Sequence, residues 1–214
     1  FDDSGQVCLA GTRLLVAESV RDEFLELFHR FTDEHVLGDP RDEATTIAPM
    51  IHPDHVARVL GFIERARANG DEIVRGGGRS DAGPLFVEPT LVVPRSNDSE
   101  IVQREVFGPV LTLQTFDTED EAIALANGTE FGLAGVLFTG DQARAERVSA
   151  QLVAGTLWVN CFFVRDLRAP FGGSRHSGVG REGGTWSFDF YCDVKNVVHR
   201  KGTFAAPDAA VGAP

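Results

Sequence analysis

The chain has little cysteine, with only Cys8, Cys161 and Cys192 among 214 residues. No pair has the Cys-x-x-Cys spacing of a zinc ribbon or a thioredoxin-type motif, so we expect no metal site. The set is odd in number and sparse, whereas a disulfide-stabilised secreted domain uses an even, denser set. These features predict a reducing, cytoplasmic setting. The apolar runs around Cys161 and Cys192 predict buried thiols at both positions.

Basic residues are also scarce. Lys and Arg number 20 against 32 Asp and Glu, which gives a net charge of −12 at pH 7. Nucleic acids and anionic membranes attract basic surfaces, so we expect neither as a partner. No apolar run approaches the roughly 20 residues that span a bilayer. The N-terminus also lacks the pattern of a secretory signal peptide.

The sequence has no initiating Met, from which we expect a fragment or a trimmed chain. Its 43% hydrophobic residues suffice for the core of about one domain. One segment departs from the acidic background, because residues 165–181 hold four arginines and one aspartate. Such a local excess of positive charge attracts small anions. The alternative is that these arginines are merely solvated on a loop.

Segments with the pattern of strands alternate with segments that have the period of helices. The expected strands cover residues 12–17, 73–74, 85–93, 110–116, 133–138 and 156–160. The expected helices begin near Ser19, with Val20, Phe24, Leu27, Phe28 and Phe31 on one apolar face, and cover residues 54–69, 118–126 and 141–152. This alternation predicts a three-layer α/β fold with a mainly parallel sheet.

The C-terminal part has a different pattern. Residues 188–194 alternate apolar and polar side chains, which predicts a strand with one aromatic face. Because nothing later in the chain would cover that face, we expect it to pair with another subunit and to form a homo-oligomer. The following Ala, Pro and Gly residues predict a flexible tail.

Residues 178–183 match the dinucleotide-binding pattern G-x-G-x-x-G. That fingerprint requires a strand before it, a helix after it and an acidic residue about 20 positions further on. Here an aromatic strand is expected to follow, and the residues near position 200 are His199, Arg200 and Lys201. We therefore interpret the match as coincidental.

Four other stretches form an ordered set: FDDSGQVCLAGTR at 1–13, EVFGPV at 105–110, GTLWVN at 155–160 and PFGGSRHSGVGREGG at 170–184. In this order and at these spacings, the chain resembles the aldehyde dehydrogenase superfamily from residue 1 to about residue 200.

Two stretches narrow the resemblance further. VRDLRAPFGG at 164–173 and REGGTWSFDFY at 181–191 are most similar to the muconic semialdehyde branch of the family. This branch includes the hydroxymuconic, aminomuconic and carboxymethyl-hydroxymuconic semialdehyde dehydrogenases of aromatic ring cleavage. One departure is Arg175, where the family commonly has Lys, and the positive charge is kept.

The resemblance implies that Cys8 is the nucleophile. Its thiolate would attack the aldehyde carbon to give a thiohemiacetal, and transfer of hydride to NAD would leave a thioester that water hydrolyses to the acid. The oxyanion would be bound by the Cys8 backbone N–H and by a side-chain amide from outside this chain. NADP stays open, because the residues that distinguish the two cofactors also lie outside.

The resemblance also implies roles for five other residues. Glu105 corresponds to the glutamate that binds the nicotinamide ribose, and Phe107 to the aromatic residue near the nicotinamide ring. Phe171 would form a wall of the substrate channel. A guanidinium binds a carboxylate in bidentate geometry, so Arg165, with Arg168 as second choice, is expected to bind the remote carboxylate of a muconic semialdehyde.

The resemblance divides the chain into a catalytic domain at 1–186, an oligomerisation strand at 187–200 and a flexible tail at 201–214. In the family, the segment before this cysteine holds the cofactor domain, the general-base glutamate and the oxyanion amide. None of these lies in the sequence. We therefore expect the isolated chain to fold at least partly and to show no turnover.

Two other functions remain as alternatives. In a thiol hydrolase, Cys8 would be the nucleophile, His176 the base and Gln6 the oxyanion glutamine of a papain-like enzyme. The Cys-Gly-Ser-Cys-Trp pattern of such enzymes is absent, however, and no Asn or Asp partner for His176 stands out. The other alternative is a dimerisation module without catalysis, which pairs through residues 188–194.

Overall fold

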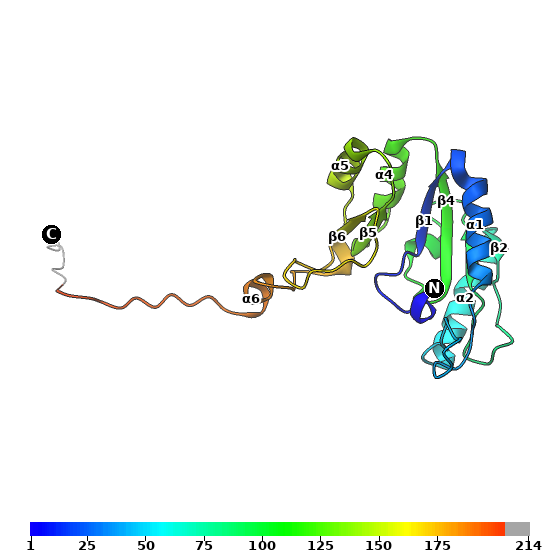
Figure 1. Ribbon diagram of the computed structural model, residues 1–214, viewed down its shortest axis with the longest axis horizontal. Coiled ribbons are helices and arrows are strands. Elements are labelled where there is room, and N and C mark those ends of the chain that lie inside the picture. Colours follow the sequence, from blue (N-terminus) through cyan, green and yellow to red (C-terminus); the bar gives the residue numbers. More distant parts are fainter. Residues whose placement is uncertain (204–214) are drawn as a thin grey trace, which may run out of the picture.

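The computed structural model describes residues 1–203, and their fold is α/β as expected (Figure 1). The larger sheet contains β1 (Arg13–Ala17), β2 (Glu72–Arg75), β3 (Thr90–Val93) and β4 (Val110–Phe116) in the order β1-β4-β3-β2. β4 lies between β1 and β3 and is parallel to both. Only the edge strand β2 is antiparallel to its neighbour. The prediction of a mainly parallel sheet is therefore confirmed.

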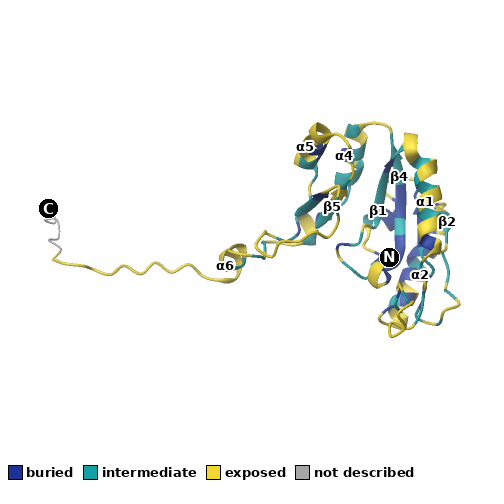
Figure 2. Ribbon diagram, in the orientation of Figure 1, coloured by how far each residue is buried: buried dark blue, intermediate teal, exposed yellow. Residues whose placement is uncertain are grey.

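Helices cover both faces of this sheet, which makes three layers. Successive strand residues point to opposite faces, and Leu91 and Val92 show this clearly. Leu91 packs in a cluster with the aromatic side of α1 (Arg21–Asp33), whereas Val92 packs in a cluster with α2 (Pro53–Asn69) and the short α3 (Glu100–Gln103). Buried residues concentrate in this sheet and in α2 (Figure 2).

The helix predicted at residues 54–69 is present as α2, and local features of the sequence explain its start, its buried face and its end. Pro53 lies in the first turn, where its missing N–H costs nothing. One apolar stripe of the helix faces the core, with Val56, Val59 and Ile63 fully buried. Gly70 ends the helix with a left-handed φ of 84°, a conformation that glycine adopts without strain.

The start and the apolar face of α1 differ from the prediction. Residues Glu18–Val20 form a 3₁₀ helix, α1 begins at Arg21, and the Ser19 side chain makes no cap hydrogen bond. Phe24 and Phe28 pack against the sheet, whereas Phe31 is 55% exposed. The reason is that α1 lies over β1 at the edge of the sheet, so only part of its apolar stripe finds a partner.

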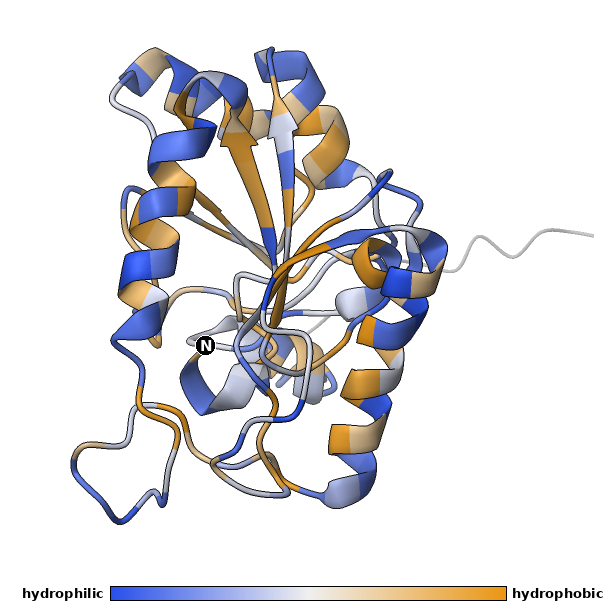
Figure 3. Ribbon diagram, turned by 90° about the vertical axis from the view of Figure 1, so that its right-hand side faces the viewer, coloured by the Kyte–Doolittle hydropathy of each residue, from blue (hydrophilic) through white to orange (hydrophobic). Residues whose placement is uncertain are grey.

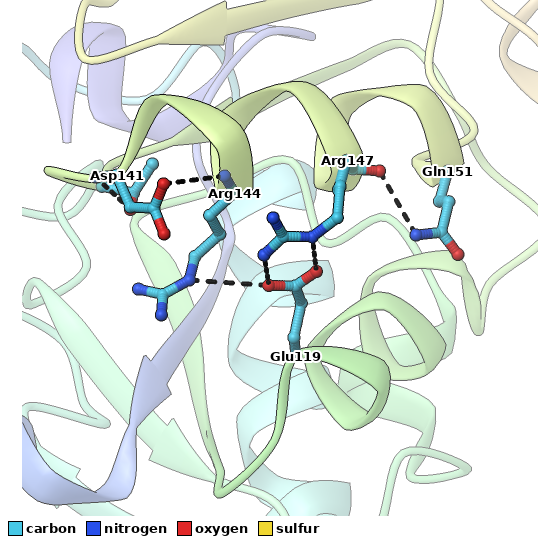
Figure 4. A network of polar contacts seen from close by, with 6 residues as sticks. Glu119, Asp141, Arg144, Arg147 and Gln151 are labelled. Atoms are coloured by element: carbon cyan, nitrogen blue, oxygen red, sulfur yellow. Dashed lines mark hydrogen bonds and ion pairs between the residues drawn. The ribbon is translucent and has the colours of Figure 1, made fainter.

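A second, two-stranded parallel sheet contains β5 (Ala134–Leu137) and β6 (Thr156–Val159). It is accompanied by α4 (Glu119–Asn127) and α5 (Gln142–Gln151), and α4 also contacts β1 and β4. Hydrophilic and hydrophobic residues alternate along the helices, as expected for helices with one face on a sheet (Figure 3). Figure 4 shows how Glu119 at the start of α4 joins Arg144 and Arg147 of α5.

The strand expected at residues 188–194 is not formed. Trp186–Tyr191 form the short helix α6 instead, and residues 192–203 follow without regular structure (Figure 1). A strand needs a neighbour for its backbone hydrogen bonds, and no strand within residues 1–203 lies beside this segment. A helix satisfies these groups locally, for example from Cys192 N to Phe188 O at 3.0 Å. The flexible tail predicted at 201–214 lies mostly outside the described residues.

The helix α6 also changes the argument about residues 178–183. A helix, not a strand, follows this glycine-rich stretch, but a 3₁₀ helix (Arg175–Ser177) precedes it where the dinucleotide fingerprint needs a strand. The match remains coincidental for that reason. None of the helices within residues 1–203 is long and apolar enough to cross a membrane.

Candidate active site

Cys8 lies in an exposed turn just before β1. The turn is closed by a hydrogen bond of 3.0 Å from Ala10 N to Val7 O, which places Cys8 near its apex. No acceptor within residues 1–203 takes the Cys8 N–H in a hydrogen bond. The thiol and a free backbone donor of the same residue are therefore both open to a small molecule.

The Cys8 turn is attached to the loop that carries Glu105 and Phe107. Gly5 has a φ of 71°, and a Cβ at this position would lie 2.1 Å from the Gly108 carbonyl oxygen. Only glycine permits this backbone contact. The contact brings together two of the motifs found in the sequence, at residues 1–13 and 105–110, which are far apart along the chain.

Phe107 has an unusual backbone conformation, with φ at 58°. A bulky residue in the left-handed region is strained and persists only where its surroundings hold it. Here His55 Nε2 lies 2.7 Å from the Phe107 carbonyl oxygen, and the two rings meet edge to face with centroids 6.4 Å apart. The half-buried ring of Phe107 is thus fixed beside α2.

The backbone at Glu105 and Val106 is held by Arg58 of α2. Its guanidinium donates to Val106 O at 2.5 Å and to Glu105 O at 2.7 Å. The Glu105 side chain is exposed and takes part in no ion pair within residues 1–203, and the neighbouring Arg104 pairs with Glu130. A carboxylate with free lone pairs on a fixed backbone can accept hydrogen bonds from a diol.

Arg165 and Phe171 are in direct contact. The Arg165 guanidinium carbon lies 4.2 Å from the centroid of the Phe171 ring, a cation–π arrangement. No carboxylate within residues 1–203 pairs with this guanidinium. Its hydrogen-bond donors therefore remain available to an anionic ligand above an aromatic wall.

Arg168 is occupied in a different way. It forms a bidentate ion pair with Asp166, at 3.0 Å from Nε and 2.7 Å from Nη2. These hydrogen bonds lower the pKa of the Asp166 carboxyl and raise the pKa of Arg168. Because Asp166 neutralises Arg168, Arg165 is the better candidate for binding a substrate carboxylate.

The other two arginines of the basic segment have structural partners. Arg175 donates to the Asn127 and Thr129 carbonyls, and Arg181 donates to the Gly173 carbonyl. Of the four arginines in this segment, Arg165 is the one whose donors have no hydrogen-bond partner within residues 1–203.

Two positioning residues were not singled out by the sequence. Arg58 looks like an ordinary charged position on α2, and nothing in its spacing points to the Glu105 loop. Arg13 follows Cys8 by five residues and donates to Leu125 O at 2.6 Å and Ala126 O at 3.1 Å, at the end of α4. Burial lowers the pKa of the Arg13 guanidinium. A charged Arg13 at the start of an apolar strand was the one sequence feature that could have indicated its role.

The groups that a papain-like hydrolase needs are engaged elsewhere. The Gln6 amide donates to Asp3 O at 3.0 Å and accepts from Ile51 N at 3.0 Å. His176 Nδ1 lies 3.2 Å from the Glu130 carboxylate. These contacts disfavour Gln6 as an oxyanion donor and His176 as the base for Cys8.

The expectation of a buried thiol is wrong for Cys192, which is exposed because the strand around it does not form. Cys161 is partly buried. All three cysteines are free. Among residues 1–203, no group of three or more His, Cys, Asp or Glu side chains could hold a metal ion.

A polar pocket of about 340 Å³ lies between α2 and α3. At its base the buried Asp71 accepts from Ser99 Oγ and Arg95 N, each at 2.8 Å. These bonds join the end of α2 to the start of α3, so this carboxylate has a structural role.

The chain matches the model of the aldehyde dehydrogenase family over residues 1–197. Curated relatives include betaine aldehyde dehydrogenases from Cereibacter sphaeroides, 42% identical over 207 residues, and from Agrobacterium fabrum, 43% identical over 210 residues. Each match covers 97% of this chain and 43% of the relative. The chain thus spans less than half the length of these relatives.

Solved structures of similar proteins have the same fold. Betaine aldehyde dehydrogenase from Staphylococcus aureus, in complex with NAD⁺, superimposes with a TM-score of 0.84 at 40% identity over 88% of this chain and 38% of its own. HpcC from Thermus thermophilus gives 0.87 at 36% identity over 95% and 42%. Both the sequence match and the fold lead to one conclusion: the chain belongs to the aldehyde dehydrogenase family.

Proposed function

We propose that this chain carries the nucleophile and the substrate-binding wall of an enzyme that oxidises an aldehyde to a carboxylic acid. The observation that carries the proposal is the attachment of the exposed Cys8 turn to the Glu105–Phe107 loop through Gly5 and Gly108. This contact places the candidate nucleophile next to a segment whose side chains suit the ribose and the nicotinamide ring of a cofactor. Family membership supports the same chemistry.

The thiolate of Cys8 would attack the aldehyde carbon, forming a C–S bond while the carbonyl π electrons move to oxygen. The Cys8 N–H, which has no acceptor within residues 1–203, can donate to that oxygen. The resulting thiohemiacetal is covalently held on the protein. After oxidation, water cleaves the thioester, which releases the acid and restores the thiol.

The residues present fit part of a nicotinamide cofactor. The free Glu105 carboxylate is suited to the two hydroxyl groups of a ribose, and the fixed Phe107 ring offers a flat apolar surface. NAD, when bound, supplies the acceptor for the hydride of the thiohemiacetal. The Staphylococcus aureus relative was solved with NAD⁺, which supports NAD; NADP remains the alternative.

Arg165 supports a carboxylated aldehyde as the substrate class. Its unpaired guanidinium over Phe171 suits an aldehyde with a carboxylate at the far end, as in a muconic semialdehyde from aromatic catabolism. The carboxylate would dock on Arg165 while the chain of the substrate lies along Phe171.

Betaine aldehyde is the second candidate, because several curated relatives are betaine aldehyde dehydrogenases. Its quaternary ammonium would need an aromatic face. On Phe171 that face is already covered by the positive charge of Arg165. The structure therefore favours the anionic substrate over the cationic one.

We also propose that the enzyme is a cytoplasmic homo-oligomer that pairs through residues 188–194. All three thiols are free, in keeping with a reducing compartment. Phe188 and Val194 are 68% and 96% exposed. Pairing with a second subunit would cover this apolar surface and supply the strand neighbour that the segment lacks here.

The test compares three substrates with the native protein that contains this chain: a 2-hydroxymuconic semialdehyde, betaine aldehyde and a neutral aliphatic aldehyde, each with NAD. We expect NADH formation with the highest kcat/KM for the carboxylated substrate. Cys8→Ser should abolish turnover, whereas Cys192→Ser, which alters the other exposed thiol, should leave it unchanged. Turnover that survives Cys8→Ser would contradict the nucleophile assignment. A protein that binds a second copy but oxidises no aldehyde would support the dimerisation module instead.

A further inference from the structure

The loop at residues 170–178, called here the Phe171 loop, is attached to the segment that follows α4, at residues 127–132. Three hydrogen bonds join the two segments: Ser174 N to Gly132 O at 2.8 Å, His176 N to Glu130 O at 3.0 Å, and Gly132 N to Ser177 Oγ at 2.9 Å. Two of these bonds join backbone to backbone, and the third joins the Gly132 backbone to a side chain. They therefore fix the main chain of the loop.

The side chain of Arg175, the one arginine or lysine of the Phe171 loop, adds to this attachment. Its guanidinium donates to Asn127 O at 2.6 Å and to Thr129 O at 2.5 Å. Asn127 is the last residue of α4. Carbonyl groups at the end of a helix lack partners within the helix and carry partial negative charge, so a cation is favourable there.

The backbone at Arg175 is strained, with φ at 56°. A non-glycine residue keeps such a conformation only when its surroundings hold it in place. Here the two carbonyl contacts of its own side chain and the amide bonds of its neighbours provide that constraint. The strain therefore indicates a segment held in one particular arrangement.

The other end of the Phe171 loop is fixed by a close backbone contact. A Cβ on Gly155, just before β6, would lie 1.6 Å from the Gly172 carbonyl oxygen. Phe171 also exchanges two backbone hydrogen bonds with Glu182, at 2.7 and 2.8 Å. The ring of Phe171 is therefore placed by contacts on both sides of it, and Arg175 provides the attachment on the carboxyl side.

We propose that Arg175 is a positioning residue for the substrate wall: by binding the end of α4, it sets the place of Phe171 and, through the stacked guanidinium, of Arg165. This inference rests on the proposed role of these two residues in substrate binding. Arg175 lies outside the Cys8 turn and the Glu105 loop, so its loss should affect aldehyde binding and spare the nucleophile.

The kinetic test compares Arg175→Met, which keeps the chain length and removes the donors, with Arg175→Lys, which keeps the charge and can bind one carbonyl. For Arg175→Met, we expect KM for the carboxylated aldehyde to rise about tenfold, with kcat changed less than about twofold. KM for NAD and the rate of Cys8 alkylation by iodoacetamide should stay unchanged. Arg175→Lys should restore most of the aldehyde KM.

The matched control is Arg41→Met, since Arg41 is another exposed arginine whose partner, Asp39, is two residues away. It should leave all four quantities unchanged. A wild-type protein that oxidises no aldehyde overturns the proposed function. An active wild type whose aldehyde KM is unaffected by Arg175→Met overturns the present inference alone.

Hydrogen exchange provides a readout that does not depend on activity. In Arg175→Met, the amides of residues 171–177 should exchange faster, while those of α2 should keep the wild-type rate. Arg175→Lys should show intermediate exchange. Unchanged exchange at residues 171–177 would contradict the positioning role. Faster exchange in α2 as well would show that Arg175 supports the whole fold, and would likewise overturn the inference.

Discussion

Gly5 and Gly108 are in backbone contact, with 2.1 Å between the Gly108 carbonyl oxygen and the place where a Gly5 Cβ would lie. This contact is the physical connection between the segment of the candidate nucleophile and the segment of the candidate cofactor residues. The order of the motifs along the chain gives no indication of it.

Gly5→Ala should therefore disrupt this connection. A side chain at a φ of 71° is strained, and its Cβ would overlap the Gly108 backbone, so we expect a loss of at least about 2 kcal/mol in the free energy of unfolding. Urea denaturation measures the change. Gly11→Ala is the matched control, because no atom lies within 4 Å of a Cβ there and its φ is not left-handed. Equal stability of the two variants would contradict the prediction.

Arg165→Met should change substrate preference. Loss of a charge-assisted hydrogen-bond partner should raise KM for a carboxylated semialdehyde by roughly ten- to a hundredfold and hardly affect a neutral aldehyde. Removal of the cation from the Phe171 face should also raise kcat/KM for betaine aldehyde. Steady-state kinetics with the three substrates measures both effects.

The control for this prediction is Arg168→Met. Asp166 already binds the Arg168 guanidinium, so its removal should have a much smaller effect on the carboxylated substrate. If Arg165→Met raised KM equally for all three substrates, Arg165 would not distinguish substrates by their charge. If Arg168→Met had the larger effect, the carboxylate would dock there.

Arg58→Met should weaken cofactor binding. The two carbonyl contacts that hold the backbone at Glu105 and Val106 would be lost, and the strained Phe107 next to them would be freer to move. We expect KM for NAD to rise about tenfold with little change in KM for the aldehyde. Arg65→Met is the control, because both arginines stack on Phe62 but Arg65 pairs with Glu100 instead. If both variants raised KM for NAD to a similar extent, the cause would be the lost packing on Phe62, and the prediction for Arg58 would be wrong.

Stability should depend on Glu119 in the acid range. The hydrogen bond from Arg147 lowers the pKa of Glu119 below its ordinary value (Figure 4). A depressed folded-state pKa gives stability that is present above the unfolded value, about 4.3, and lost as the pH falls through the folded value. The difference in urea midpoint between wild type and Glu119→Gln should therefore shrink as the pH is lowered from 6 toward 3. Asp120→Asn is the matched control, since it removes a neighbouring carboxylate that forms no ion pair within residues 1–203.

The sequence by itself determined the parts of the fold that depend on local signals. The stripe of Val56, Val59 and Ile63 and the glycine at position 70 specify α2 without help from other elements. The β4 strand has the predicted bounds because its side chains suit burial on both faces. The motifs around Cys8, Glu105 and Phe171 likewise sufficed to indicate the family, since the spacing of chemical groups along a chain is a property of the sequence.

Only the tertiary structure decided which residues meet. The alternating pattern at 188–194 suits a strand, but a strand also requires a neighbour. Without one in residues 1–203, Trp186–Tyr191 form α6 and the residues after them have no regular structure. The sequence named Arg165 and Arg168 as first and second choice for a substrate carboxylate, and the structure separates them: Asp166 neutralises Arg168, whereas Arg165 stacks on Phe171. The contacts of Arg58 and Arg175 with distant carbonyl groups have no sequence signal. Such partners are brought together by chain folding, because hydrogen bonds and ion pairs act over a few ångströms in space whatever the separation in sequence.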